Sequence, residues 1–307
     1  MTHHRFAPTR FHNAIGSHEP VLRIASGDSV STWCVDARGR DSHDVEITAR
    51  GNPQTGPFYI EGAAPGDTIA VHLDRMRPNR PRGWSNSVIA PWIVDAGFVH
   101  SMPRGKLDEW DVNATAGTAT LRVPSPGLQS LRPLPIDPML GCFGVAPPGG
   151  QAISTATSST HGGNMDYRGF REGVTVYFPV FVEGALFHLG DGHAVQGDGE
   201  IVGTGIEISF DVTFTVRLIK DWATNWPRAE NATDIMTVGN ARPLDQCVQH
   251  ATTEMLIWLH EDFGLDSEDA SRLLGQCIRY DLGNIFDPAY TMVARVAKSL
   301  LPTRMAR

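Results

Sequence analysis

Several residue patterns that mark particular protein classes are scarce in this chain of 307 residues. Lysine occurs only at Lys106, Lys220 and Lys298, which limits any mechanism that needs a catalytic lysine. The formal net charge is −8, and the chain has no basic stripe of the kind that binds phosphate. We therefore expect no nucleic acid partner.

Cysteine is also sparse. The four cysteines, Cys34, Cys142, Cys247 and Cys277, lie too far apart in sequence to form a zinc knuckle or a redox pair. A chain of this length can bury a large core without disulfides. We interpret the four as reduced thiols, mostly buried, in a reducing compartment.

Long apolar runs are missing as well. The most apolar run, 174–187, is interrupted by Pro179 and Glu183 and is too short to span a bilayer. The first ten residues are polar and lack the apolar core of a signal peptide. These features predict a cytoplasmic protein with no membrane partner.

From about residue 10 to 220 the chain consists of short β-prone segments separated by glycine, proline, asparagine and aspartate. Apolar residues alternate strictly from Ile206 to Leu218, as in a strand with one buried face. Turn signals such as Pro65-Gly66-Asp67 and Gly190-Asp191-Gly192 separate the expected strands. Many short strands with frequent turns predict a mainly β body, a sandwich or a barrel.

Helical patterns dominate the C-terminal part. Apolar residues recur at helical spacing from Leu244, and Gly264 is placed to end that helix. Asp266 or Ser267 can cap a second helix, and Asp287-Pro288 is expected to begin a third. We predict a β-rich body over residues 1–220, with a possible crossing segment at 124–138, and a C-terminal helical layer over 221–307 packed on it.

The stretch from His188 to Glu200 is the richest in chemistry. It holds five groups that can bind a metal or move a proton, set among four glycines that allow close approach. Asp191, His193 and Glu200 are ligand types suited to zinc, and an open three-ligand site leaves room for water. The alternative is a polar hairpin loop with incidental histidines. The spacing does not match an EF-hand.

A second stretch runs from Ser158 to Asp166 and places His161, Gly162, Gly163 and Asn164 together. Asparagine amides and glycine N–H groups are suitable oxyanion donors. The alternative is a turn with a surface histidine. Ser158-Ser159 does not support a Ser-Ser-Lys amidase because no lysine has a suitable setting, and no Gly-x-Ser-x-Gly elbow is present.

A third set of candidate residues consists of two acids in strand-like surroundings, Asp36 and Glu61. A buried acid at either position would need a partner. On the residues alone we expect both acids to be exposed.

Taken together, these segments resemble the acetamidase/formamidase family. The matching stretches, in the family's order, are Asn52–Pro57, Glu61–Asp67, Gly144–Pro147, His161–Asp166, Gly190–His193 and Gln196–Glu200. The resemblance runs over nearly the whole chain and implies hydrolysis of short aliphatic amides, a mainly β body with an α/β part, and a homo-oligomer, dimer or higher. The segment 83–104, His188 and the stretch 155–160 depart from the family pattern, and these changes could reshape the substrate pocket.

As a mechanism we hypothesise a divalent metal, zinc or else calcium, held by a subset of Asp36, His161, Asp191 and His193. Glu200 is the expected general base. Asp166 is the alternative candidate, either for the general base or for a metal ligand. Asn164 and the N–H groups of Gly162 and Gly163 are expected to stabilise the oxyanion.

Two other interpretations stay open. Cys142, in the loop-like setting Gly141-Cys-Phe-Gly144, could act as a nucleophile as in nitrilase-type amidases. Alternatively, the chain could be a non-catalytic β-sandwich module that binds a small ligand, with a structural calcium site in the 190–200 loop.

Overall fold

The fold comes from a computed structural model, which describes residues 1–305. Two large sheets form its body. The larger has nine strands, in the order β1 (His3–Arg5), β4 (Ser29–Cys34), β17 (Phe210–Ile219), β6 (Thr68–Pro78), β15 (Thr175–Pro179), β18 (Arg228–Glu230), β19 (Asp234–Ala241), β21 (Tyr290–Ala297) and β20 (Arg279–Asn284). The second has six, in the order β13 (Ser158–Ser159), β14 (Gly162–Asn164), β11 (Met139–Gly144), β16 (Phe187–His193), β5 (Thr55–Ile60) and β3 (Leu22–Ile24).

The two sheets share one apolar core. In β17 the expected alternation is present, with Phe210, Val212, Phe214 and Val216 buried. The ring of Phe214 meets that of Phe58 in β5 at 5.2 Å and that of Phe187 in β16 at 5.3 Å, measured between centroids. Because these contacts join opposite sheets, the predicted sandwich-like body is confirmed.

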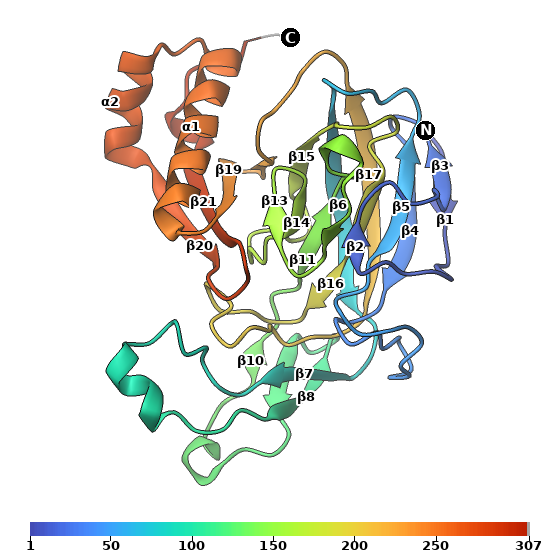
Figure 1. Cartoon of the computed structure of the whole chain (residues 1–307), viewed down its shortest axis with the longest axis vertical. Coiled ribbons are helices and arrows are strands. Elements are labelled where there is room, and N and C mark those ends of the chain that lie inside the picture. The colour runs from blue at the N-terminus through green and yellow to red at the C-terminus, as the bar shows by residue number, and fades with distance from the viewer. Residues whose placement is uncertain (306–307) are drawn as a thin grey trace.

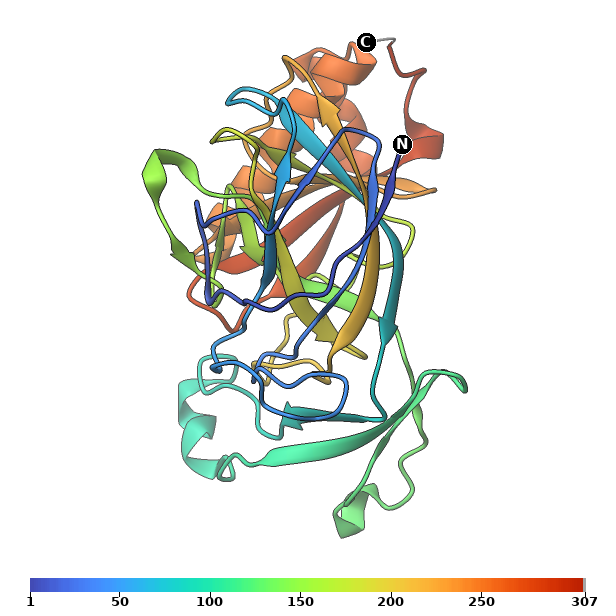
Figure 2. The same ribbon diagram turned by 90° about the vertical axis from the view of Figure 1, so that its right-hand side faces the viewer.

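A smaller four-stranded sheet extends from one end of this body (Figures 1 and 2). Its order is β10 (Leu134–Pro135), β9 (Thr118–Leu121), β8 (Leu107–Asn113) and β7 (Arg82–Asn86). A two-stranded ribbon pairs β12 (Ile153–Ser154) with β2 (Ala14–Ile15). Short 3-10 turns are η1 (Ala96–Ser101), η2 (Pro126–Leu128), η3 (Pro148–Gly150) and η4 (Lys298–Leu300).

Two helices, α1 (Leu244–Phe263) and α2 (Ser267–Cys277), pack beside β19 and β21 (Figure 1). Gly264 ends α1 with a φ of 67°, and the side chain of Asp266 accepts hydrogen bonds from the N–H groups of Glu268 and Asp269. Both predicted helix boundaries are confirmed. None of the helices in the described part of the chain is long and apolar enough to cross a membrane.

The predicted third helix at Asp287-Pro288 is wrong. These residues lie in the turn between β20 and β21, two strands that pair antiparallel at the edge of the larger sheet. Asp287-Pro288 forms a turn and not a helix start, because the residues that follow form β21, which pairs with β19 along its whole length. The division into two parts near residue 220 stays a prediction.

The predicted turn at Gly190-Asp191-Gly192 is also wrong, since all three residues lie inside β16. The two glycines serve close packing. A Cβ at Gly190 would lie 2.8 Å from the side chain of Gln54, and one at Gly192 would lie 2.1 Å from the ring of Phe210. The absence of side chains lets β16 run through the middle of the body with both faces buried.

Candidate active site

Six ionisable side chains meet where the ends of the two large sheets come together. Asp191 and His193 belong to β16, Asp166 follows β14, and Glu200 lies in the turn after β16. Glu207 precedes β17, and Asp287 lies between β20 and β21. Their ligand atoms form three overlapping groups within 4.8 Å of one another: Asp166 with Asp191 and His193, His193 with Glu200 and Glu207, and Asp166 with Glu200 and Asp287. We call these six residues the acidic cluster.

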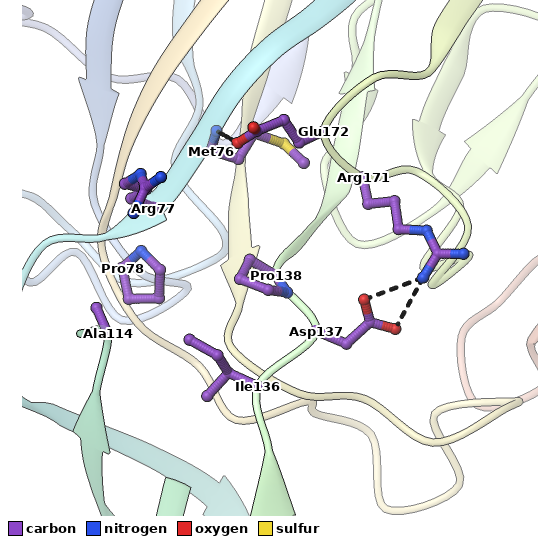
Figure 3. A pocket seen from close by; sticks show the side chains of 9 residues that line it. All are labelled: Met76, Arg77, Pro78, Ala114, Ile136, Asp137, Pro138, Arg171 and Glu172. Atoms are coloured by element: carbon purple, nitrogen blue, oxygen red, sulfur yellow. Dashed lines mark hydrogen bonds and ion pairs between the residues drawn. The ribbon is translucent and has the colours of Figure 1, made fainter. Parts of the chain in front are cut away.

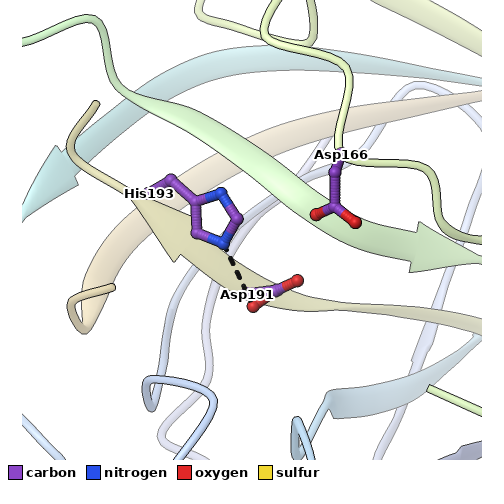
Figure 4. A group of neighbouring side chains, drawn as sticks. All are labelled: Asp166, Asp191 and His193. Carbon is purple, nitrogen blue, oxygen red and sulfur yellow. Dashed lines mark ion pairs between the residues drawn. The ribbon is translucent and has the colours of Figure 1, made fainter. Parts of the chain in front are cut away.

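Figure 4 shows the first of these groups. The Nε2 atom of His193 lies 3.4 Å from a carboxylate oxygen of Asp191, and Asp166 points toward both from the loop after β14. Strand β11 passes close by, where a Cβ at Gly141 would lie 2.2 Å from Oδ1 of Asp166 and 2.7 Å from Oδ2 of Asp191. Only glycine leaves room for both carboxylates at this point.

The backbone is strained at the acidic cluster. Asp166, Asp191 and Glu200 have positive φ angles of 42°, 62° and 49°, a region that residues other than glycine seldom adopt. Strain of this kind costs on the order of 1–3 kcal/mol per residue and persists where the surroundings enforce it. Three such residues with converging carboxylates indicate a functional site.

Amide side chains hold the cluster in place. Nδ2 of Asn164 donates to Asp166 at 2.8 Å and to Asp287 at 2.6 Å, while its oxygen accepts from Asn52 at 2.8 Å. Nδ2 of Asn284 also donates to Asp166 and Asp287, at 2.6 Å and 2.8 Å. Asn164 therefore positions carboxylates, and its amide is already committed to them.

Gln196 fixes the orientation of His193. Its Oε1 lies 2.8 Å from Nδ1 of the imidazole, and its Nε2 donates to the carbonyl of Asp166 at 2.5 Å. Nδ1 therefore carries the proton that Oε1 accepts, and this contact directs Nε2 of the ring toward the carboxylates. Nε2 lies 2.8 Å from Oε1 of Glu207 but without the alignment of a hydrogen bond.

Burial and, after it, the crowding of negative charge shift the pKa values in the cluster. Burial, and then the neighbouring carboxylates, raise the pKa of Asp166 and of Glu200 well above the usual range. Burial likewise raises the pKa of Glu207 to about 7 and that of Asp287 to about 6. Burial would lower the pKa of His193, but the charges of Glu207 and Asp191 outweigh it and raise it well above its usual value.

These residues fit a divalent cation. Oδ1 of Asp166, Nε2 of His193 and Oε2 of Glu207 are buried and have no hydrogen-bond partner among residues 1–305. A buried polar atom without a partner is costly, and carboxylates with an imidazole are suitable ligands for zinc. Without a metal, the raised pKa values show that protons must partly neutralise the cluster.

The structure brings four of the residues singled out from the sequence together, namely Asp166, Asp191, His193 and Glu200. Asp36 is not exposed as expected but fully buried, and it lies outside the three groups of ligand atoms. Its Oδ1 accepts from the N–H groups of Arg38 and Arg40, and its Oδ2 accepts from Arg80 and Trp84. Glu61 is exposed, as predicted.

His161 also lies outside these groups. It is fully buried, which lowers the pKa of its imidazole to about 4, and neither ring nitrogen has a hydrogen-bond partner in the described part of the chain. Gly162 and Gly163 lie in β14, which pairs with β11 on one side and β13 on the other. Cys142 is buried in β11, where burial and the nearby Asp191 raise the pKa of its thiol well above the usual value. A nucleophilic cysteine needs the opposite shift.

Four important residues were missed from the sequence: Glu207, Asp287, Asn284 and Gln196. Glu207 lies within the alternating apolar run, and Asp287 carries the signal of a helix start. Only the pairing of distant segments brings them to the site, as in the hydrogen bond from the N–H of Ile285 to the carbonyl of Gly199. Gln196 was visible inside the 188–200 stretch, three residues after His193, a spacing suited to a side-chain contact.

A pocket of about 410 Å³ opens onto the acidic cluster. Asp191, Glu200 and Glu207 of the acidic cluster line this pocket, and Arg38 and Trp84 line it as well. A second pocket, of about 250 Å³, lies beside β6 (Figure 3), but its carboxylates are engaged: Asp137 pairs with Arg171 at 3.2 Å and Glu172 accepts from the N–H of Met76 at 3.2 Å. The first pocket is therefore the candidate active site.

Comparisons with known proteins identify the fold and its relatives. The model of the acetamidase/formamidase family matches residues 145–249. An acetamidase structure from Yersinia enterocolitica is 33% identical, with a TM-score of 0.83 over 98% of this chain and 93% of that one. The chain belongs to the acetamidase/formamidase family. A predicted acetamidase/formamidase from Thermoanaerobacter tengcongensis is 28% identical, with a TM-score of 0.84 over 97% of both chains.

Among curated relatives, the acetamidase of Mycolicibacterium smegmatis is 29% identical over 253 residues, which cover 66% of this chain. The matched part spans 62% of the length of that relative. The predicted family resemblance is confirmed, and the family-matched segment 145–249 includes Asp166, Asp191, His193, Glu200 and Glu207.

Proposed function

We propose that this protein hydrolyses short carboxamides to a carboxylate and ammonia, with a divalent metal, preferably zinc, held in the acidic cluster. The observation that carries the proposal is the set of buried ligand atoms on Asp166, His193 and Glu207 that have no hydrogen-bond partner in the described part of the chain, together with the strained backbone of Asp166, Asp191 and Glu200. The relatives named acetamidase and formamidase support amide hydrolysis as the reaction.

Asp166, Asp191 and His193 are the proposed ligands, because their ligand atoms converge and Gln196 directs Nε2 of His193 toward the carboxylates. A metal bound there would polarise the amide oxygen and lower the pKa of water near it. Glu207 and Asp287 border the same space and could contribute further oxygen ligands.

Glu200 is the proposed general base and acid. It lines the pocket, and Oε2 is 3.3 Å from Nδ2 of Asn284, which orients the carboxylate. Burial and the neighbouring carboxylates raise its pKa, so Glu200 can both take a proton from water and return it to the departing nitrogen. The amide of Asn164 is engaged with carboxylates, and Gly162 and Gly163 lie in β14 between two paired strands and do not line the pocket. Their role as oxyanion donors stays a prediction from the sequence.

The four cysteines are free thiols, which supports the proposed location in a reducing cytoplasm. A homo-oligomer, dimer or higher, stays a prediction from the family resemblance.

The decisive test is ammonia release from formamide, acetamide and propionamide by the full chain, before and after chelation and after zinc is restored. We expect release that chelation abolishes and zinc restores. Ammonia release that chelation does not change but thiol blocking abolishes would instead support Cys142 as the nucleophile. Metal binding without release from any amide would support a binding module with a structural calcium or zinc site.

A further inference from the structure

The active-site pocket is lined by groups of opposite charge. The carboxylates of Asp191, Glu200 and Glu207 form the part that belongs to the acidic cluster, here called the floor, and Arg38 lines the pocket beside Trp84. A cavity of about 410 Å³ falls within the range that holds molecules much larger than acetamide. A substrate of acetamide's size would reach the floor and leave the rest of the pocket to water.

Arg38 differs from the other arginines nearby. The guanidinium groups of Arg40, Arg50 and Arg80 form ion pairs with Asp44, Glu46 and Asp36, at 3.1 Å, 2.9 Å and 2.5 Å. The guanidinium of Arg38 has no ion pair or hydrogen bond within residues 1–305, and its central carbon lies 5.3 Å from the centre of the Trp84 ring. Its donors are therefore available to a ligand in the pocket.

The surrounding structure fixes the position of Arg38. The buried carboxylate of Asp36 accepts from the backbone N–H of Arg38 at 2.9 Å and from Nε1 of Trp84 at 2.9 Å, so one group fixes both the backbone that carries Arg38 and the ring beneath its guanidinium. The carbonyl of Ala37 accepts from the N–H of Asn52 at 3.0 Å. Since the side chain of Asn52 donates to Asn164, the segment that carries Arg38 is tied to the acidic cluster.

We propose that the substrate of this site is a short carboxamide that carries a carboxylate at its far end, such as the monoamide of a dicarboxylic acid, and that Arg38 binds this carboxylate. The inference rests on the proposed amide hydrolysis. The amide end meets the metal-binding floor, and the carboxylate end meets the planar, stacked guanidinium, whose fork of donors matches a carboxylate. The negative floor disfavours the reverse orientation.

The test is the ratio of kcat/KM for two matched amides, measured as ammonia release with the zinc-loaded full chain. One is the monoamide of butanedioic acid, and the other is 4-methylpentanamide, in which an isopropyl group replaces the carboxylate. A charge-assisted contact corresponds to about a ten- to hundredfold preference for the anionic amide. Arg38→Gln should bring the ratio close to one, chiefly by raising KM for the anionic amide.

Arg40→Gln is the matched control, because Arg40 lies on the same loop, pairs with Asp44 and does not line this pocket. It should keep the wild-type ratio. A wild-type ratio at or below one, with 4-methylpentanamide or propionamide still hydrolysed, would overturn the inference and leave the proposed function standing. Ammonia from none of the amides would overturn the proposed function itself. The wild-type ratio does not depend on whether either variant folds.

Discussion

Two regions of this molecule bury charge in opposite ways. Beneath α1, the guanidinium of Arg228 is fully buried, pairs with Glu254 at 2.6 Å and with Glu261 at 3.0 Å, and lies over the rings of Trp222 and Trp258. In the acidic cluster, four carboxylates are buried and a fifth, that of Asp287, is half-buried around a single imidazole. The first region balances its charge with the chain's own side chains, whereas the second leaves a surplus of negative charge.

The difference separates a structural ion pair from a ligand site. Burying an unpaired charge costs several kcal/mol, so a fold retains such a surplus where something from outside completes it. Asp36 belongs with the first kind, because Arg80, Trp84 and two backbone N–H groups saturate its oxygens. The strained backbone of Asp166, Asp191 and Glu200 is instead a feature of the ligand site.

The largest expected effect comes from Glu200→Gln, which keeps the shape of the side chain but cannot carry a proton. We expect kcat for acetamide to fall by about 10²- to 10⁴-fold, the usual contribution of general acid–base catalysis. The zinc content per chain, measured by mass spectrometry of the purified variant, should stay near that of the wild type. Full activity would remove Glu200 from the mechanism, and loss of zinc together with activity would make it a ligand instead.

Opposite effects on stability should distinguish the two regions in the metal-free protein. Glu254→Gln removes the closer of the two carboxylate partners of a buried guanidinium and should lower the free energy of unfolding by about 3 kcal/mol. Asp287→Asn replaces a carboxylate whose pKa is raised to about 6 with a neutral amide. It should increase the free energy of unfolding by about 1–2 kcal/mol at pH 8. Urea unfolding of both variants after chelation measures the two changes in the free energy of unfolding. A decrease of equal size in both would erase the proposed distinction.

A smaller effect is expected from pH. Glu207, with a pKa raised to about 7, and Asp287, at about 6, keep protons in the folded state that the unfolded chain releases near pH 4. The contribution of these two groups to the free energy of unfolding is therefore fully present below about pH 4. It declines as pH rises through their folded pKa values. The melting temperature of the chelated protein should fall by several degrees from pH 5 to pH 8.

Zinc should remove this decline, since it binds the deprotonated ligands and replaces the protons. The measurement is a melting curve at each pH with and without zinc. A melting temperature of the chelated protein that rises steadily over the same range would contradict the proton-for-metal exchange.

The sequence predicted the β body and both helix boundaries because these depend on local patterns, namely the alternation in β17 and the capping by Gly264 and Asp266. It predicted Asp191, His193 and Glu200 because they lie together in a glycine-rich stretch. It misread Gly190-Asp191-Gly192 as a turn, since glycine signals a turn and close strand packing equally. It missed Glu207 and Asp287 because only long-range pairing places them at the site: Glu207 bridges to His193 and Trp84, and Gly199 bridges to Asn284 near Asp287.

The most direct test of the account is titration of zinc into the chelated full chain at pH 7, followed by calorimetry in two buffers of different ionisation enthalpy, so that proton release is measured with binding. We predict binding that releases protons from the acidic cluster, restores amide hydrolysis in proportion to occupancy, and is lost in Asp191→Asn while Asp36→Asn keeps it. Zinc binding that survives in Asp191→Asn, or the absence of zinc binding by the wild type, would contradict the assignment of the acidic cluster as the metal centre.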